Sequence, residues 1–189
     1  MLTRWRKSRL RRAALKARDQ AAAQSPDAFK TLVETFPDAL WPAINTVVAG
    51  YRAIGSELDP SALMETFALE QARLCLPAVT GPDAPLQFRA WSPGDELVRG
   101  AFGVEEARSE ASVLTPSLVL VPLVAFDASG GRLGYGAGYY DRTLAALSAN
   151  GPVTAVGLAY AAQEVRRIPA GAHDVALDAV VTERGVIVF

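Results

Sequence analysis

The chain contains 189 residues, half of them hydrophobic, which is enough to bury the core of one domain and excludes an intrinsically disordered protein. Its formal net charge is −1, yet eight of the nineteen basic residues precede position 20, so a basic segment is followed by an acidic body. The single cysteine, Cys75, excludes an intramolecular disulfide, and the single histidine, His173, excludes a metal site built from several histidines. No apolar run reaches the roughly 18 to 20 residues of a membrane span, so we expect a cytoplasmic protein.

Residues 3–23 are predicted to form a helix with one basic side. The narrow apolar stripe of this helix, at spacings of four, three and four, consists of Leu10, Ala14, Ala17 and Ala21. Lys7, Arg11 and Arg18 fall together on an adjacent face. Such a helix suits a solvated surface, but it also suits binding to nucleic acid or to a membrane surface, because basic side chains neutralise phosphates without any further motif.

Strands and helices then alternate along the chain. In order, the expected elements are a helix from Ser25 towards Leu40 that breaks at Pro37, a strand over 46–51, a helix over 61–72, and strands over 74–79 and 86–91. A strand, a helix and a second strand with short connections form a βαβ unit and therefore predict a parallel sheet. Glu57 lies beyond the carboxyl end of the first strand, where open α/β sheets bind ligands. A carboxylate there also favours the dipole of the following helix, so both interpretations stay open.

A glycine-rich loop follows the most apolar segment of the sequence. Residues 117–126 predict a strand buried on both faces in the middle of the sheet. Five glycines lie between positions 130 and 138, and a helix-like pattern begins at position 139. This order of strand, loop and helix leaves backbone N–H groups unpaired and suits phosphate binding. The spacing fits neither GxxxxGK[ST] nor GxGxxG, which disfavours both familiar nucleotide folds. Further strands are expected over 153–160, 179–182 and 186–189.

The segment LVPLVAFDASGGRLGYGAGYYDR, residues 120–142, closely resembles the signature of the 5-formyltetrahydrofolate cyclo-ligase (methenyltetrahydrofolate synthetase) family. Residues 7–11, KSRLR, fit the family's Lys-x-x-Leu-Arg pattern, and residues 99–105 resemble a third family segment, although Glu106 stands where proline is usual. Residues 173–178 resemble the final segment of the family signature. Two residues depart from the signature: Leu123 replaces a common glycine, and Ala137 replaces a position that is often Gly or Lys.

This resemblance implies a three-layer α/β/α fold with a largely parallel sheet, similar to the sugar-phosphate isomerase and CoA-transferase group. It also implies conversion of 5-formyltetrahydrofolate to 5,10-methenyltetrahydrofolate, with ATP as co-substrate, Mg²⁺ as cofactor, and release of ADP and phosphate. The γ-phosphoryl group would activate the formyl oxygen as a leaving group before N10 of the folate closes the ring. We therefore expect a single domain over residues 1–189, with the basic helix packed on it, that acts as a monomer without nucleic-acid or membrane partners.

The resemblance implies roles for individual residues as well. The residues that would bind ATP are Lys7, Ser8, Arg9, Leu10, Arg11, Arg132, Leu133, Gly134, Tyr135, Gly136, Ala137, Gly138, Tyr139 and Tyr140. The residues that would contact the folate are Arg52, Glu57, Tyr135, Gly136, Ala137, Gly138 and Tyr139. Arg132 and Tyr139 would act in catalysis, and Asp141 and Asp178 would hold Mg²⁺. His173 is expected to be structural.

Two other functions remain open from the sequence. A nucleotide- or RNA-binding protein could use the basic helix alone, and it would bind nucleic acid with a steep salt dependence. An enzyme like a sugar-phosphate isomerase could share the fold, but its reaction needs neither ATP nor Mg²⁺.

Overall fold

The computed structural model describes residues 2–189, and a seven-stranded sheet forms its centre. The strand order is β11-β10-β9-β6-β1-β2-β3. The strands of this sheet are β1 (Val47–Ala49), β2 (Arg73–Ala78), β3 (Gln87–Ala90), β6 (Leu118–Pro122), β9 (Thr154–Leu158), β10 (Ala179–Thr182) and β11 (Gly185–Val188). The five inner strands run parallel, whereas β3 and β11 pair antiparallel at the two edges. The parallel sheet predicted from the βαβ pattern is confirmed.

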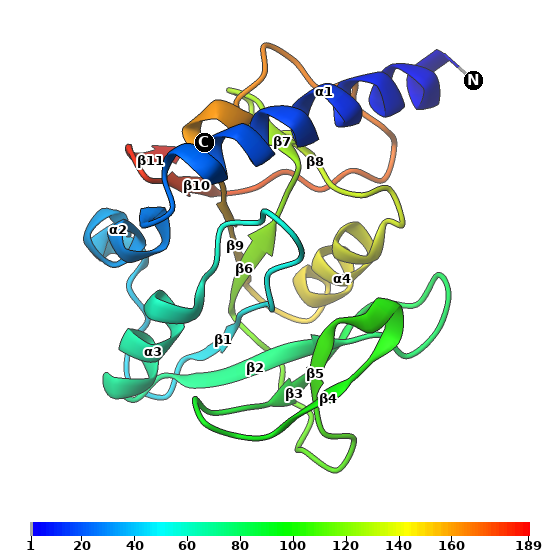
Figure 1. Ribbon diagram of the computed structural model, residues 1–189. Helices are drawn as coiled ribbons and strands as arrows, with labels where there is room; N and C mark the ends of the chain where they lie inside the picture. The colour runs from blue at the N-terminus through cyan, green and yellow to red at the C-terminus, as the bar shows by residue number, and fades with distance from the viewer. Residues whose placement is uncertain (1) are drawn as a thin grey trace.

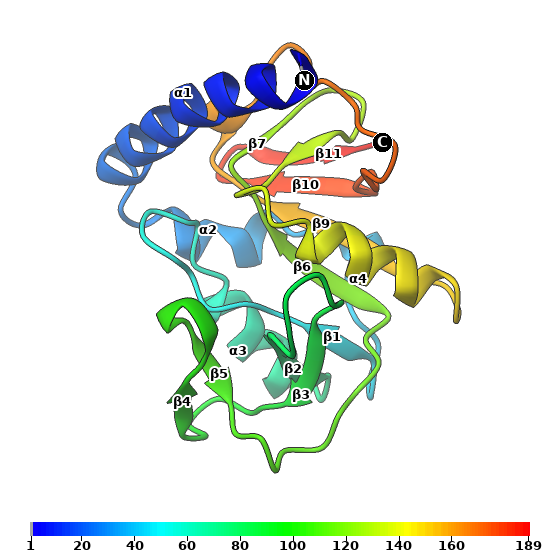
Figure 2. The ribbon, with the colours of Figure 1, turned by 90° about the vertical axis from the view of Figure 1, so that its right-hand side faces the viewer.

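Helices cover both faces of this sheet (Figures 1 and 2). Alternate residues of β6 point to opposite faces, as the pleat requires. Leu118 and Leu120 pack with α2 (Ala28–Thr35) and α3 (Ser61–Leu69), while Val119 and Val121 pack with α4 (Tyr139–Ser148). The three-layer α/β/α arrangement is therefore confirmed, with β6 in the middle of the sheet as its apolar sequence predicts.

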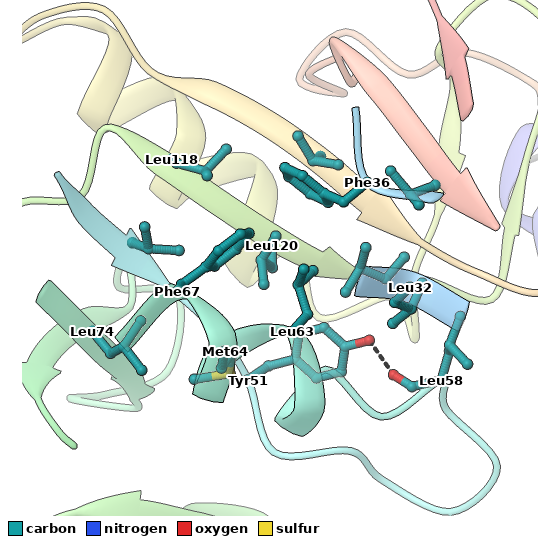
Figure 3. Close-up of a cluster of buried hydrophobic side chains, with 14 of the residues drawn as sticks. Leu32, Phe36, Tyr51, Leu58, Leu63, Met64, Phe67, Leu74, Leu118 and Leu120 are labelled. Carbon is teal, nitrogen blue, oxygen red and sulfur yellow. Dashed lines mark hydrogen bonds between the residues drawn. The ribbon is translucent and has the colours of Figure 1, made fainter. Parts of the chain in front are cut away.

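The core between α2, α3 and the sheet also fixes a loop that matters for function. Figure 3 shows Leu32 from α2, Phe36 directly after that helix, and Phe67 from α3 gathered around β6. Next to them, the buried Tyr51 hydroxyl donates a hydrogen bond to the carbonyl of Leu58 (Figure 3). Burial raises the pKa of Tyr51, so its hydroxyl stays protonated and remains a donor. This bond closes the loop of residues 52–57 that follows β1.

Several predicted elements differ from the observed ones. The strand expected over 117–126 is interrupted after Pro122: β7 (Ala125–Phe126) leaves the main sheet and pairs with β8 (Arg132–Leu133). Proline lacks the N–H that a ladder requires, which explains the break. The second helix begins at Ala28 rather than at Ser25, and the next helix ends at Leu69 because Gln71 adopts φ 66°. The sequence did not indicate the hairpin of β4 (Leu97–Arg99) and β5 (Glu105–Ala107). Short 3-10 turns complete the connections at Asp38–Leu40, Ala101–Gly103 and Ala161–Gln163.

The first helix, α1 (Leu2–Gln24), matches the helix predicted over 3–23 and lies beside β7 and β8 in both views (Figures 1 and 2). Its buried Ala14 packs against Ala125, Leu133 and Ile168, and Leu10 joins this cluster, so the apolar stripe read from the sequence is the packed side. Within residues 2–189, no helix has the length and hydropathy needed to cross a membrane.

The Asp127 carboxylate stabilises the β7–β8 hairpin beneath α1 through hydrogen bonds. Its Oδ1 accepts hydrogen bonds from the N–H and hydroxyl of Ser129, at 3.0 and 2.6 Å, and from the N–H of Gly131 at 3.1 Å. Its Oδ2 accepts the N–H of Ile168 at 2.7 Å, so one carboxylate joins the hairpin to the segment on which α1 packs. Burial opposes ionisation, but these hydrogen bonds prevail and lower the pKa of Asp127.

We expect Asp127→Asn to reduce the free energy of unfolding by about 1–3 kcal/mol at neutral pH, because the amide would turn a donor towards the N–H of Ile168. A group with a lowered folded pKa stabilises the fold above its unfolded pKa, and the contribution is lost as the pH falls through the folded value. The difference between the two proteins should therefore shrink below about pH 4. Urea denaturation of both proteins, from neutral pH to below about pH 4, measures this difference in the free energy of unfolding. As a control, Ser129→Ala should cost less and keep the pH dependence; equal stability of Asp127→Asn and wild type would contradict the role of Asp127.

Candidate functional site

The glycine-rich loop places a row of unused backbone donors at the start of α4. Gly136 and Gly138 adopt φ 106° and 73°, and Gly138 forms the left-handed N-cap of the helix. No N–H group from Gly134 to Tyr140 donates a hydrogen bond to another part of the chain described by the structure. Together with the positive end of the helix dipole, these groups form a concentration of donors suited to an anion. Ala137 does not have a positive φ, so its replacement of a family glycine introduces no backbone strain.

The buried Arg132 forms an ion pair with the partly exposed Asp141 behind this loop. The Arg132 Nη2 atom lies 2.6 Å from Asp141 Oδ1, and its Nη1 donates to the carbonyl of Val175. The N–H of Val175 donates to the same Asp141 oxygen at 3.2 Å. Burial lowers the pKa of Arg132, and the charge of Asp141 opposes this shift, so the arginine remains a cation. Arg132 thus orients the first turn of α4, and its role in catalysis stays a prediction.

The basic face of α1 lies against the same loop. Arg11 Nε donates to the carbonyl of Gly134 at 2.7 Å, and Lys7 Nζ lies 2.5 Å from Asp174 Oδ2. Although burial opposes it, the hydrogen bond from Lys7 lowers the pKa of Asp174. Ser8 and Arg9, which the resemblance also assigns to ATP, are exposed, and Leu10 packs in the core below. The structure therefore brings Arg11 to the glycine loop and Lys7 to Asp174, but leaves Arg9 facing solvent.

A cleft of about 360 Å³ lies beside the loop after β1, within the usual range for small-molecule sites. Its walls come from residues 52–55, which include the predicted folate contact Arg52, from residues 102–105 of the third family segment, and from Asp59. Arg52 and Glu105 form an ion pair across it, with Nη2 and Oε2 3.2 Å apart. The exposed Phe102 ring meets Tyr139 edge-on at 6.2 Å between centroids, and the Arg142 guanidinium lies 5.0 Å from the centre of the Tyr139 ring. Tyr139 therefore joins the glycine loop to the cleft.

Glu57 does not line this cleft but lies under its wall. Its Oε2 accepts the N–H of Ile54, a wall residue, at 2.8 Å. Its Oε1 lies 3.7 Å from the Nη1 atom of Arg18, and both side chains are almost completely buried. Burial raises the pKa of Glu57, while the N–H of Ile54 and the charge of Arg18 oppose that shift. The Arg18 Nη2 atom donates to the Tyr135 hydroxyl at 2.9 Å, so this buried pair also reaches the glycine loop.

The two predicted magnesium ligands have separate partners. Asp178 is exposed at the start of β10, where its Oδ2 accepts the N–H of Ala155 at 2.7 Å. Asp141 belongs to the first turn of α4 and is held by Arg132 and Val175. Across residues 2–189, no three or more His, Cys, Asp or Glu side chains are grouped as a metal cage. The magnesium assignment of Asp141 and Asp178 remains a prediction.

Two residues of this region were given no role in the site from the sequence, although Arg18 was placed on the basic face of the first helix. Arg18 lies seven positions after Arg11 and shares its helix face, so the helical period carried a signal, but nothing in the motif pointed to a buried charge. Phe102 adopts φ 57° within a 3-10 turn and is 80% exposed. An exposed aromatic with a positive φ is detectable only in three dimensions.

Comparisons with known proteins agree on one family. A model of the 5-formyltetrahydrofolate cyclo-ligase family matches residues 3–183. The 5-formyltetrahydrofolate cyclo-ligase of Mycolicibacterium smegmatis is 38% identical over 149 residues, which cover 74% of this chain and 75% of that protein. The enzyme of the same name from Escherichia coli K12 is 34% identical over 140 residues, covering 71% and 76%. The NMR structure of Aquifex aeolicus 5,10-methenyltetrahydrofolate synthetase superposes with a TM-score of 0.72 at 32% identity, covering 96% of this chain and 92% of that one.

The loop geometry predicts which glycines are irreplaceable. Gly136→Ala and Gly138→Ala should each lower the free energy of unfolding by about 1–2 kcal/mol, because a side chain disfavours the left-handed backbone conformation. Gly134→Ala is the matched control: its φ is not positive, and a Cβ there would have no neighbour within 4 Å. It should be neutral or slightly stabilising. Chemical denaturation of the three variants measures this order, and a loss at Gly134 equal to the others would contradict the loop conformation.

Proposed function

The chain belongs to the 5-formyltetrahydrofolate cyclo-ligase family, and we propose that it catalyses the ATP- and Mg²⁺-dependent cyclisation of 5-formyltetrahydrofolate to 5,10-methenyltetrahydrofolate. The family makes the chain a ligase of folate one-carbon metabolism and implies ATP as its co-substrate. The proposal adds which residues bind each substrate and how the reaction proceeds. It also retains the sequence-based expectations of a single domain over residues 1–189 and of a monomer.

The position of Tyr139 is the observation that carries this proposal. Its backbone belongs to the row of free N–H groups, and its ring meets Phe102 at the edge of the cleft. Phosphates bound by the N–H groups and a folate in the cleft would therefore approach each other at this residue. Lys7 and Arg11 add positive charge on the phosphate side, since both reach the loop or its neighbour Asp174. On the folate side, Arg52 and the loop that contains Glu57 would hold the pterin.

The chemistry needs positioning and charge neutralisation more than a nucleophile of the protein. The formyl oxygen attacks the γ-phosphorus, ADP departs, and the oxygen becomes part of a phosphate leaving group. N10 then attacks the formyl carbon and loses its proton, the five-membered ring closes, and phosphate leaves. Donors held in place before the reaction stabilise the charge that gathers on the phosphoryl oxygens. The N–H groups of Gly134 to Tyr140 provide such donors, and the Arg132–Asp141 pair holds the helix start that presents them.

Asp141 fits a magnesium-binding role better than Asp178 does. Its carboxylate is partly exposed in the first turn of α4, directly after the row of N–H groups, and only its Oδ1 accepts hydrogen bonds from the described residues. Mg²⁺ is commonly held by one or two carboxylates and by the phosphates of its substrate. Such an ion would neutralise phosphate charge there. Asp178 lies three residues beyond Val175, whose N–H contacts Asp141, so it remains the second proposed ligand.

The proposed activity is tested by mixing the protein with 5-formyltetrahydrofolate, ATP and MgCl₂ and following the near-ultraviolet absorbance of the methenyl product. One ADP should form per product, and omission of ATP should stop the reaction. A protein that binds both substrates but forms no product would show that the cyclo-ligase proposal is wrong for this chain. Product formation that does not consume ATP would contradict the phosphorylation step.

The basic face of α1 gives a prediction about ATP. The double variant Lys7→Ala/Arg11→Ala should raise KM for ATP by about tenfold or more, because charge-assisted contacts contribute about 1.5–3 kcal/mol each, and should leave KM for the folate within about twofold. Arg12→Ala is the matched control, since Arg12 is exposed on the same helix. Steady-state kinetics with each substrate varied decide the result. A double variant that keeps its ATP kinetics but loses RNA binding would instead support the binding-protein alternative.

A further inference from the structure

Arg18 is a buried cation that connects three segments of the site. It projects from α1 and is only 3% exposed. Its Nε donates to the Ser56 hydroxyl at 3.0 Å, and its Nη2 donates to the Tyr135 hydroxyl at 2.9 Å. Its third nitrogen, Nη1, faces Glu57 Oε1 at 3.7 Å, which is too long for a hydrogen bond. The helix, the loop after β1 and the glycine loop thus converge on one guanidinium group.

The facing atoms of this pair lack hydrogen-bond partners. Arg18 Nη1 and Glu57 Oε1 are buried, and neither makes a hydrogen bond with the residues that the structure describes. Almost all buried polar atoms in native proteins have a partner, and a charged atom without one carries a large desolvation cost. The Tyr135 hydroxyl lies close enough to Glu57 to oppose the rise in its pKa that burial causes, whereas Tyr51 and Tyr140 act on Glu57 only through charge. One donor and one acceptor therefore lie side by side under the wall of the cleft, and neither atom makes a hydrogen bond with the described residues.

A lactam edge is complementary to this arrangement, because it presents an N–H donor beside a carbonyl acceptor. We propose that Arg18 is a specificity-determining residue of the folate site: Glu57 Oε1 accepts the N3–H of the pterin while Arg18 Nη1 donates to the C4 carbonyl. This inference rests on the proposed function, and it adds a second group to the pterin contact that the resemblance assigns to Glu57 alone. A site with both groups prefers a substrate that satisfies both, because the wrong substrate leaves a buried charge unpaired.

Tyr135 is the side chain that covers the pair. Its hydroxyl bonds to Arg18, and the Arg18 guanidinium lies 5.7 Å from the centre of its ring. Tyr135 is itself 49% exposed, and it sits between Gly134 and Gly136 in the glycine loop. A pterin that contacts Arg18 and Glu57 would require this side chain to turn towards solvent.

The test compares two substrates that differ at the lactam edge: 5-formyltetrahydrofolate and its 4-amino analogue, in which an amino group replaces the C4 carbonyl and N3 carries no hydrogen. Wild type should prefer the carbonyl compound in kcat/KM by about tenfold or more, since the analogue turns a donor towards Arg18 and a lone pair towards Glu57. Arg18→Met keeps the length of the side chain and removes its donors, so this preference should fall by about tenfold. The ratio of the two values cancels any loss common to both substrates, such as a smaller fraction of folded protein.

Control variants separate recognition from a structural role. Arg18→Lys should retain part of the preference because it keeps a donor and the charge, and Arg12→Met, exposed on the same helix, should retain all of it. KM for ATP should stay unchanged in each variant. If both substrates lose kcat/KM equally in Arg18→Met, Arg18 is only structural and the inference is wrong.

If Arg18→Met does not fold, Arg18→Lys and wild type carry the test: a preference that is the same in both, or a wild type without preference between the two compounds, overturns the inference. If wild type forms no methenyl product, the proposed function fails separately. Calorimetric titration of wild type with each compound then tests the same preference as a ratio of dissociation constants.

Discussion

The contact of a basic helix with a glycine-rich loop is the interaction on which the rest of this site depends. Three side chains on one face of α1 reach functional segments: Arg11 the carbonyl of Gly134, Lys7 the carboxylate of Asp174, and Arg18 the hydroxyl of Tyr135. The helix is anchored from below by Ala14 and Leu10. The sheet alone offers backbone donors at the start of α4, and α1 adds the fixed positive charge that a polyphosphate requires.

Two ion pairs, the buried Arg18–Glu57 pair and the partly exposed Arg132–Asp141 pair, hold the loops of the site to this frame. Burial of a charged group costs solvation energy that the attraction within the pair only partly returns, so such pairs contribute little net stability. What they do provide is geometry, because each arginine binds a carboxylate and also a group of another segment: Arg132 the carbonyl of Val175, and Arg18 the hydroxyl of Tyr135. The charges therefore order the loops, while the apolar faces of β6 supply the stability.

Much of the fold could be predicted because it depends on local patterns. The helix over 3–23, the βαβ unit and the buried β6 follow from periodicity and composition, and each is confirmed. The departure of the chain after Pro122 was not predicted, since a continuous apolar run carries no sign of where a ladder ends. The motif identified the glycine loop. It did not indicate that Glu57 lies under the cleft wall beside Arg18, because these two residues are 39 positions apart and meet only through tertiary packing. A short motif can identify functional residues, but the partners of those residues depend on the whole fold.

The side chains that could act as nucleophiles show why the proposed reaction depends on positioning. Burial raises the pKa of Cys75 to about 12, so at neutral pH it is a protonated thiol enclosed by the sheet. His173 is exposed beyond the Lys7–Asp174 pair, in the segment before β10. The groups that do converge are donors and fixed charges: the N–H groups before α4, Lys7, Arg11 and the Tyr139 ring at the cleft. A transfer from one bound substrate to the other needs only that both be held in line and their charge neutralised. An arrangement of this kind provides those two conditions without a covalent intermediate on the protein.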